Sequence, residues 1–226
     1  MTITTAHLTR TAGLAAAVAG AIFLAVQINH PPMVGASAQT TDWVVRSDAK
    51  AVMAALVLVG ITGMYLRQFR RLGLFGAIGY AVFAAGYLTM FSVEIIAAAV
   101  LPALAPTEPA YVNDVIVAAA GGTPAGDIGG MGSLLQVTGI AYLAGGLLFG
   151  IALFRTGVLA RWAAALLALG TVATAALAVL PESFNRPMAV PVGVALIGLG
   201  VSLWRNPQDV AAPSVATGPV REPAVR

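Results

Sequence analysis

The chain has 226 residues, of which 59% are hydrophobic and 9% charged, and it contains no cysteine. A soluble domain carries about 25% charged and about 45–50% apolar residues, so this composition excludes a water-soluble protein and indicates a membrane protein. Without cysteine there are no disulfides, thiolate metal sites or cysteine nucleophiles, and the formal net charge of +3 comes from arginines beside apolar runs, which excludes a nucleic-acid surface.

Six apolar stretches are long enough, or nearly long enough, to cross a bilayer, for which a helix needs about 20 residues. We therefore predict an all-α fold, a polytopic transmembrane helical bundle of about six spans within residues 1–205. The spans cover approximately residues 11–28, 49–68, 72–101, 131–154, 158–180 and 187–204. The last segment, 206–226, contains four prolines and no apolar period, which predicts a disordered cytoplasmic tail.

The first span has an alternative interpretation as a signal peptide. Arg10 precedes its apolar run, and Ala36-Ser37-Ala38 has the small-x-small form of a cleavage site. However, the apolar run has about 18 residues, and about ten more, including Pro31 and Pro32, separate it from Ala38. We favour an uncleaved span. Cleavage would leave five spans in the same orientation.

Glu94, in the third span, is the only acidic residue inside an apolar run, and ionisable groups in a membrane are candidate functional residues. It lies 22 residues after Leu72, which at about 1.5 Å per residue places it roughly 33 Å from the inner boundary, near the outer edge of the hydrocarbon core. Tyr80, Tyr87 and Glu94 recur every seven residues and therefore share one helix face.

Two interpretations of Glu94 follow from its neighbours. The first is an interfacial ion pair with one of the basic residues expected on the same side of the membrane. These are Arg46, Lys50 and Arg186. The second is an outward-facing polar vestibule, because polar groups in lipid associate with one another and two other spans carry them at a comparable depth. They are Gln27, Asn29 and His30 on the first span and Ser133, Gln136 and Thr138 on the fourth.

From these patterns we take five residues as candidates for contacting a ligand or partner. They are Glu94, Tyr87, Gln136, Arg46 and Lys50. Hydrogen bonding between helices, without any ligand, would explain the same polar cluster.

The outer loop, residues 102–130, is the one long connection expected between spans. Its prolines and glycines bracket an apolar island, Tyr111–Ala120. Thr107 offers a helix cap, Glu108 an acidic first turn and Pro109 a fixed φ. About ten residues cannot cross a bilayer, so we predict a short interfacial helix here.

Basic residues mark one side of the predicted bundle. If six spans alternate, nine of the 12 basic residues lie on that side: Arg10, Arg67, Arg70, Arg71, Arg155, Arg161, Arg205, Arg221 and Arg226. The positive-inside rule then places both termini in the cytoplasm and the protein in the plasma (inner) membrane. Trp162 and Trp204 fall at the inner boundary and Trp43 near the outer one, as an aromatic belt requires.

Small residues recur at helix-packing intervals. Gly146 and Gly150 form a GxxxG motif, and Ala16 and Gly20 form a small-xxx-small pair. Such pairs let helix backbones approach closely. We interpret them as packing within one protomer, with a homo-oligomer interface as the alternative.

Two segments resemble a known group of proteins. Arg10-Thr11-Ala12-Gly13-Leu14 enters the first span, and 154–162, Phe-Arg-Thr-Gly-Val-Leu-Ala-Arg-Trp, precedes the fifth. Together they resemble small bacterial, actinobacterial multi-pass membrane proteins grouped as a domain of unknown function. The resemblance covers residues 10 to about 204. It implies the architecture and carries no activity.

The sequence contains no arrangement typical of an enzyme. His7 and His30 flank the first span on opposite sides, so they cannot share a haem or metal ion. HExxH, GxSxG and phosphate-loop motifs are missing. We therefore expect no enzymatic activity, cofactor, metal or nucleic-acid partner. The predicted function is a structural or partner-binding role in the bilayer; the alternative is a small-molecule or ion transporter with an outer polar vestibule.

Overall fold

The computed structural model describes residues 4–175 and 187–206. Within these ranges the chain forms helices, turns and loops and no strand, so the predicted all-α helical bundle is confirmed. The elements, in chain order, are α1 (Thr5–Ala25), η1 (Gly35–Gln39), α2 (Thr41–Ile95), η2 (Ile96–Val100), α3 (Leu101–Leu104), α4 (Pro109–Ala119), α5 (Gly130–Thr156), α6 (Arg161–Ala173), η5 (Pro187–Ala189) and α7 (Val190–Arg205).

Four helices in the described part of the chain are long and apolar enough to cross a membrane. They are Thr5–Ala25, Thr41–Leu104, Gly130–Thr156 and Pro187–Arg205. This is therefore a membrane-embedded protein. α6 is apolar but shorter, and the end of the predicted fifth span lies outside the described residues. Arg186 and the predicted tail beyond Asn206 lie outside them too.

The longest helix, α2, is a hairpin of two antiparallel arms. Gln68 (φ −146°) and Gly73 (φ +58°) leave helical geometry between the arms, and the left-handed φ of Gly73 suits glycine because no Cβ clashes there. Across the hairpin Tyr65 stacks on Tyr80, with ring centroids 4.5 Å apart. The turn thus falls where the sequence predicted the second span to end and the third to begin.

Glycines set the close approach of the helices. A Cβ on Gly20 of α1 would lie 2.5 Å from the carbonyl oxygen of Gly193 in α7, and a Cβ on Gly79 of α2 would lie 2.7 Å from the backbone nitrogen of Phe149 in α5. The GxxxG glycines of α5, Gly146 and Gly150, face α6 of the same chain. The prediction of packing within one protomer is therefore confirmed for these glycines.

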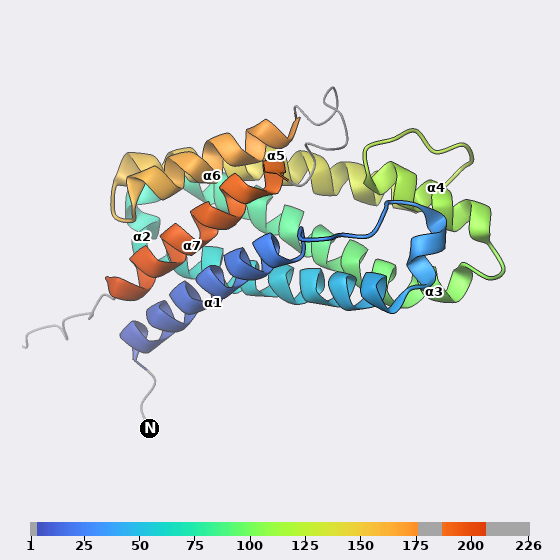
Figure 1. Ribbon diagram of the computed structural model, residues 1–226. Coiled ribbons are helices and arrows are strands. Elements are labelled where there is room, and N and C mark those ends of the chain that lie inside the picture. Colours follow the sequence, from blue (N-terminus) through green and yellow to red (C-terminus); the bar gives the residue numbers. More distant parts are fainter. Residues whose placement is uncertain (1–3, 176–186, 207–226) are drawn as a thin grey trace, which may run out of the picture.

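The bundle has two different ends (Figure 1). The turn end carries the α2 turn at residues 68–73, the α5–α6 connection at 157–160, the start of α1 and the end of α7. The capped end carries η1, α3, α4 and the loop 120–129. The main hydrophobic core fills the bundle between the ends, and a second, smaller core lies at the capped end.

The capped end contains the short helix that the sequence predicted in the outer loop. α4 runs over Pro109–Ala119 and buries Val112, Val115 and Ile116 in the second core. Its N-cap is Glu108, which makes no side-chain capping bond; Thr107 instead donates a hydrogen bond to the carbonyl oxygen of Leu104. Thr107 therefore does not cap the helix as predicted, because the turn that ends α3 engages its hydroxyl.

Candidate functional site

Glu94 faces Lys50 across the α2 hairpin. The Lys50 Nζ and Glu94 Oε1 atoms are 3.7 Å apart, and their side chains are 19% and 15% exposed. Lys50 is one of the three basic residues that were predicted to lie on the same side of the membrane as Glu94. A charge-assisted hydrogen bond has a donor–acceptor distance of about 2.7–2.9 Å, so this is a loose ion pair whose members also face open space.

That space is a cavity of about 440 Å³ at the capped end. Its charged and polar wall consists of Lys50, Glu94, Gln27, His30 and Thr138. The rest of its lining is apolar or small: Phe23, Val26, Met33, Met53, Met90, Val93, Ala118, Ala119, Ala120, Gly121, Leu135 and Gly139. Sites for small molecules have this character, about 300–1,000 Å³ of mostly apolar surface with a few convergent polar groups.

Five segments of the chain converge on this cavity. The end of α1 supplies Phe23 and the residues after it, the two arms of α2 supply Lys50 and Glu94, the end of α4 covers one side, and α5 contributes Thr138. Polar residues that the sequence placed at a common depth on the first, third and fourth spans therefore meet here. The methionines and the contribution of α4 were not predicted, since nothing in their local pattern indicates a cavity wall.

A second, smaller cavity of about 50 Å³ also touches the Lys50–Glu94 pair. Its wall includes Trp43, Ala97 and Leu101 and is otherwise mainly apolar. The ion pair thus lies between the second core and the large cavity.

A π-helical turn, η2, begins two residues after Glu94. Leu101 N–H donates to the carbonyl oxygen of Ile96, five residues earlier. In this register the carbonyl of Ala97 would need a donor from Pro102, which has no N–H. The indole Nε1 of Trp43 supplies it instead, 3.0 Å away. Such turns are frequent at functional sites, and this one fixes the end of the helix that carries Glu94.

Trp43 therefore differs from its predicted role in an aromatic belt. It is only 5% exposed and belongs to the second core. Its indole N–H is used inside the protein because the π-turn leaves a buried carbonyl without a backbone donor. The exposed tryptophans, Trp162 and Trp204, lie at the turn end.

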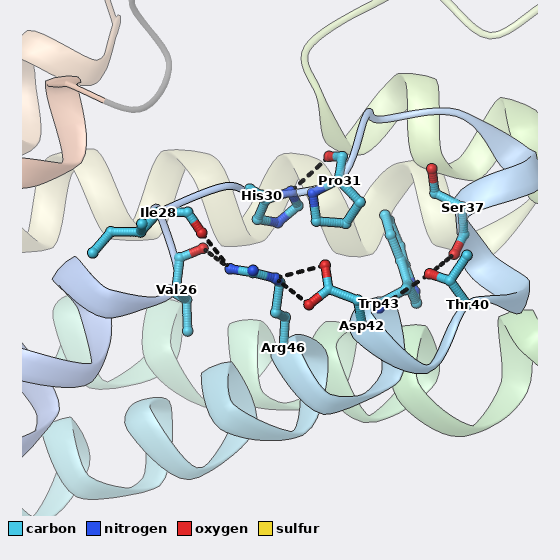
Figure 2. Close-up of polar contacts among 9 residues, drawn as sticks. All are labelled: Val26, Ile28, His30, Pro31, Ser37, Thr40, Asp42, Trp43 and Arg46. Carbon is cyan, nitrogen blue, oxygen red and sulfur yellow. Dashed lines mark hydrogen bonds and ion pairs between the residues drawn. The ribbon is translucent and has the colours of Figure 1, made fainter.

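Arg46 lies in a separate network (Figure 2). Its Nε donates to both carboxylate oxygens of Asp42 at 2.9 Å, and its Nη1 donates to the carbonyl oxygens of Val26 and Ile28 at 3.1 and 2.8 Å. The last carbonyls of a helix have no intrahelical partner. Arg46 therefore caps the end of α1 and holds the chain that leads to His30, and the structure does not bring it to Glu94.

Tyr87 and Gln136 are also placed away from Glu94. Tyr87 is fully buried among the aromatic rings of Phe83 and Tyr142, and within the described residues its hydroxyl has no hydrogen-bond partner. Gln136 is exposed and lines a different hollow of about 350 Å³ beside the loop 121–128. Tyr87 lies two turns deeper in the bundle than Glu94, and Gln136 lines a neighbouring hollow that shares Ala118, Gly121 and Leu135 with the cavity. The structure therefore does not bring Tyr87 or Gln136 into the cavity lining that contains Glu94, and a joint role for the three residues stays a prediction.

His30 shows how the loop after α1 is held over the cavity. Its Nδ1 donates to the carbonyl oxygen of Pro31 at 2.8 Å, and its ring meets Trp43 edge-on with centroids 6.4 Å apart (Figure 2). Within residues 4–175 and 187–206 no three His, Asp or Glu side chains gather in a way that could hold a metal ion.

Comparison of the chain with models of protein families, with curated proteins and with solved structures finds no match. The family resemblance noted in the sequence therefore stays a prediction.

Proposed function

We propose that this protein is a multi-pass plasma-membrane protein, with about six spans and both termini in the cytoplasm, that binds a small amphipathic ligand at its outer, capped end. The observation that carries this proposal is the Lys50–Glu94 pair in the wall of the 440 Å³ cavity. A partner-binding role, rather than catalysis, is the function this arrangement supports best.

The ion pair and the apolar wall suit complementary parts of such a ligand. Lys50 and Glu94 can each gain a shorter contact from a polar head group, since their own separation of 3.7 Å exceeds hydrogen-bond length. Three methionines, Met33, Met53 and Met90, line the apolar part, and methionine adapts its shape to irregular ligands.

The proposed orientation rests on the charges of the two ends. In the described part of the chain, the arginines of the turn end are Arg10, Arg67, Arg70, Arg71, Arg155, Arg161 and Arg205, whereas Arg46 and Lys50 lie toward the capped end. The acidic side chains described lie toward the capped end too: Asp42, Asp48, Glu94, Glu108, Asp114 and Asp127. The positive-inside rule favours a cytoplasmic turn end.

Transport is the second candidate function, because a cavity with polar and charged wall residues could form the outer part of a route. Toward the turn end the bundle is filled by Phe83, Tyr87, Tyr142 and Phe149, whose rings contact one another. A transport path needs polar groups or broken helices near the midplane. The aromatic packing argues for binding without passage.

Native mass spectrometry of detergent-solubilised protein tests the binding proposal. The wild-type chain should retain a molecule of defined mass that Glu94→Gln loses, because the neutral amide no longer complements a cationic group. Asp48→Asn is the matched control, since Asp48 is an exposed carboxylate on the same hairpin and should leave retention unchanged. A wild-type protein that retains nothing, or equal retention by Glu94→Gln, would contradict ligand binding at this cavity.

Single-cysteine labelling tests the orientation, and the natural chain has no cysteine to interfere. Thr123→Cys at the capped end should react with a membrane-impermeant maleimide added to intact cells. Arg70→Cys at the turn end should react only after lysis. Both positions are exposed, so the reverse pattern would place the turn end outside and overturn the proposed topology.

A further inference from the structure

A groove runs between α1 and the first arm of α2, near the turn end and on the opposite half of the molecule from the ion pair. It has a volume of about 330 Å³ and is mainly apolar. Its lining residues are Thr5, Leu8, Thr9, Ala12, Val59, Thr62, Gly63, Leu66 and Arg67. From Val59 to Arg67 the groove follows eight residue steps of helix, or about 12 Å. This length accommodates part of one lipid acyl chain.

The groove adjoins a basic hollow. This second hollow, of about 500 Å³, is lined by Leu66, Arg67, Gln68, Phe69, Arg70, Arg71 and Val158. Leu66 and Arg67 belong to both linings. The apolar groove therefore lies beside three arginines grouped around the hairpin turn.

These arginines have no carboxylate partners in the described part of the chain. The ion pairs found there join Arg46 to Asp42 and Lys50 to Glu94, both toward the capped end. Arg67 Nε instead donates to the carbonyl oxygen of Asn206 at 3.3 Å, which holds the guanidinium at the junction of the groove and the hollow. Guanidinium groups bind phosphate oxygens with matching geometry.

We propose that the α1–α2 groove and the adjoining arginines bind one anionic phospholipid of the surrounding bilayer, with an acyl chain in the groove and the phosphate against Arg67 and its neighbours. The positive-inside rule explains arginines at this level of a membrane protein but does not require a hollow that shares lining residues with an apolar groove. Basic pockets between membrane helices are known to suit such head groups. This site is independent of the proposed function.

The other basic turn provides an internal comparison. The Arg155 and Arg161 guanidinium groups lie over the rings of Phe75 and Phe154, 5.9 and 5.8 Å from the ring centroids. They carry the same charge at the same end of the bundle without lining the groove. Neutralising them should therefore lower the general attraction of the surface for anions and leave the groove site intact.

The test is a native mass spectrometry titration of the full-length protein in detergent with palmitoyl-oleoyl phosphatidylglycerol or phosphatidylcholine. One phosphatidylglycerol molecule should bind the wild-type chain in preference to phosphatidylcholine. Arg67→Gln/Arg71→Gln should weaken that binding by about 30-fold, since each basic group near an anionic lipid contributes about fivefold. Arg155→Gln/Arg161→Gln should not.

A second pair of variants examines the acyl groove. Val59 is exposed and lines the groove, whereas Val52 is exposed on the same arm but outside it. Val59→Trp should fill the groove and weaken phosphatidylglycerol binding, whereas Val52→Trp should not, with melting temperatures recorded to verify folding. Glycerol 3-phosphate, the head group without chains, should not compete. Equal binding of the two lipids, equal losses from both arginine double variants, no effect of Val59→Trp, or competition by glycerol 3-phosphate would overturn the proposal.

Discussion

The capped end and the turn end of this protein differ in how their polar and charged side chains are placed. At the capped end, polar groups are placed in pairs: Lys50 with Glu94, Arg46 with Asp42, and Trp43 with the carbonyl of Ala97. At the turn end, arginines lie over aromatic rings, while the helices behind them are drawn together by glycines. Both ends therefore have openings, a cavity beside the polar pairs and hollows beside the arginines, and aromatic rings close the bundle between them.

The largest expected effect comes from the glycine-packed region. Gly79→Leu would force a side chain against the backbone of Phe149, because a Cβ at position 79 would lie only 2.7 Å from the Phe149 backbone nitrogen. Backbone cannot move aside as a flexible side chain can, so we expect a loss of about 3 kcal/mol or more in the free energy of unfolding. Thermal unfolding in detergent measures it. Gly139→Leu is the control because a Cβ there meets nothing within 4 Å, and an equal loss in that variant would refute the packing argument.

The next effect concerns the ion pair. Glu94→Leu leaves the Lys50 ammonium facing the cavity without its carboxylate, and we expect roughly 1–3 kcal/mol of destabilisation. Replacing both residues removes the stranded charge, so Glu94→Leu/Lys50→Leu should be more stable than Glu94→Leu alone. Melting temperatures of the wild type, both single variants and the double variant form a double-mutant cycle that measures the interaction between the two charges. Strictly additive losses would mean that the two charges do not interact.

A smaller effect is expected at the π-turn. Trp43→Phe keeps an aromatic ring in the second core but removes the N–H that donates to Ala97. A buried carbonyl without a donor costs about 1–3 kcal/mol, and we expect the lower part of that range because phenylalanine retains most of the packing. Chemical or thermal unfolding gives the value. Trp204→Phe, at an exposed position of the turn end, should have no effect, and a Trp43→Phe variant as stable as the wild type would refute the bond's role.

The smallest effect belongs to Arg46. Its partner Asp42 is 53% exposed, and exposed ion pairs contribute only about 0–1 kcal/mol. Arg46→Gln should therefore lower the free energy of unfolding by about 1 kcal/mol or less, mainly by uncapping α1. Hydrogen exchange should be faster at residues 26–30 and unchanged in α5. A uniform increase across the bundle would show that Arg46 supports the whole fold and not one helix end.

The apolar stretches of the sequence predicted the helices well, because a helix that crosses lipid needs an apolar stretch of nearly fixed length. The turn at residues 68–73 was also recognisable, because it contains arginines and a glycine at which a helix can end. The site was predicted only in part. Seven-residue spacing places Tyr87 and Glu94 on one helix face, but it does not indicate that this face is covered by other side chains at one depth and borders a cavity at another. Tyr87 therefore lies in the aromatic core and Glu94 at the cavity.

The fourth span shows the same limit. Leu135, Thr138 and Gly139 line the main cavity, and on a helix these positions fall on one side because each residue turns by about 100°. Gln136 is one step away from Leu135 and belongs to another hollow. Composition gives the depth of a polar residue, whereas its direction depends on how neighbouring helices rotate against one another, which a single sequence does not encode visibly.

The π-turn after Glu94 has a consequence for how the chain enters the bilayer. The Ala97 carbonyl depends on Trp43, 54 residues earlier in the sequence, and a buried carbonyl without a donor costs about 1–3 kcal/mol. The third apolar stretch is therefore fully stable only when the second already lies beside it. We expect the two arms to leave the translocation machinery as one unit, because Pro102 has no N–H to donate to Ala97 and Trp43 on the first arm does.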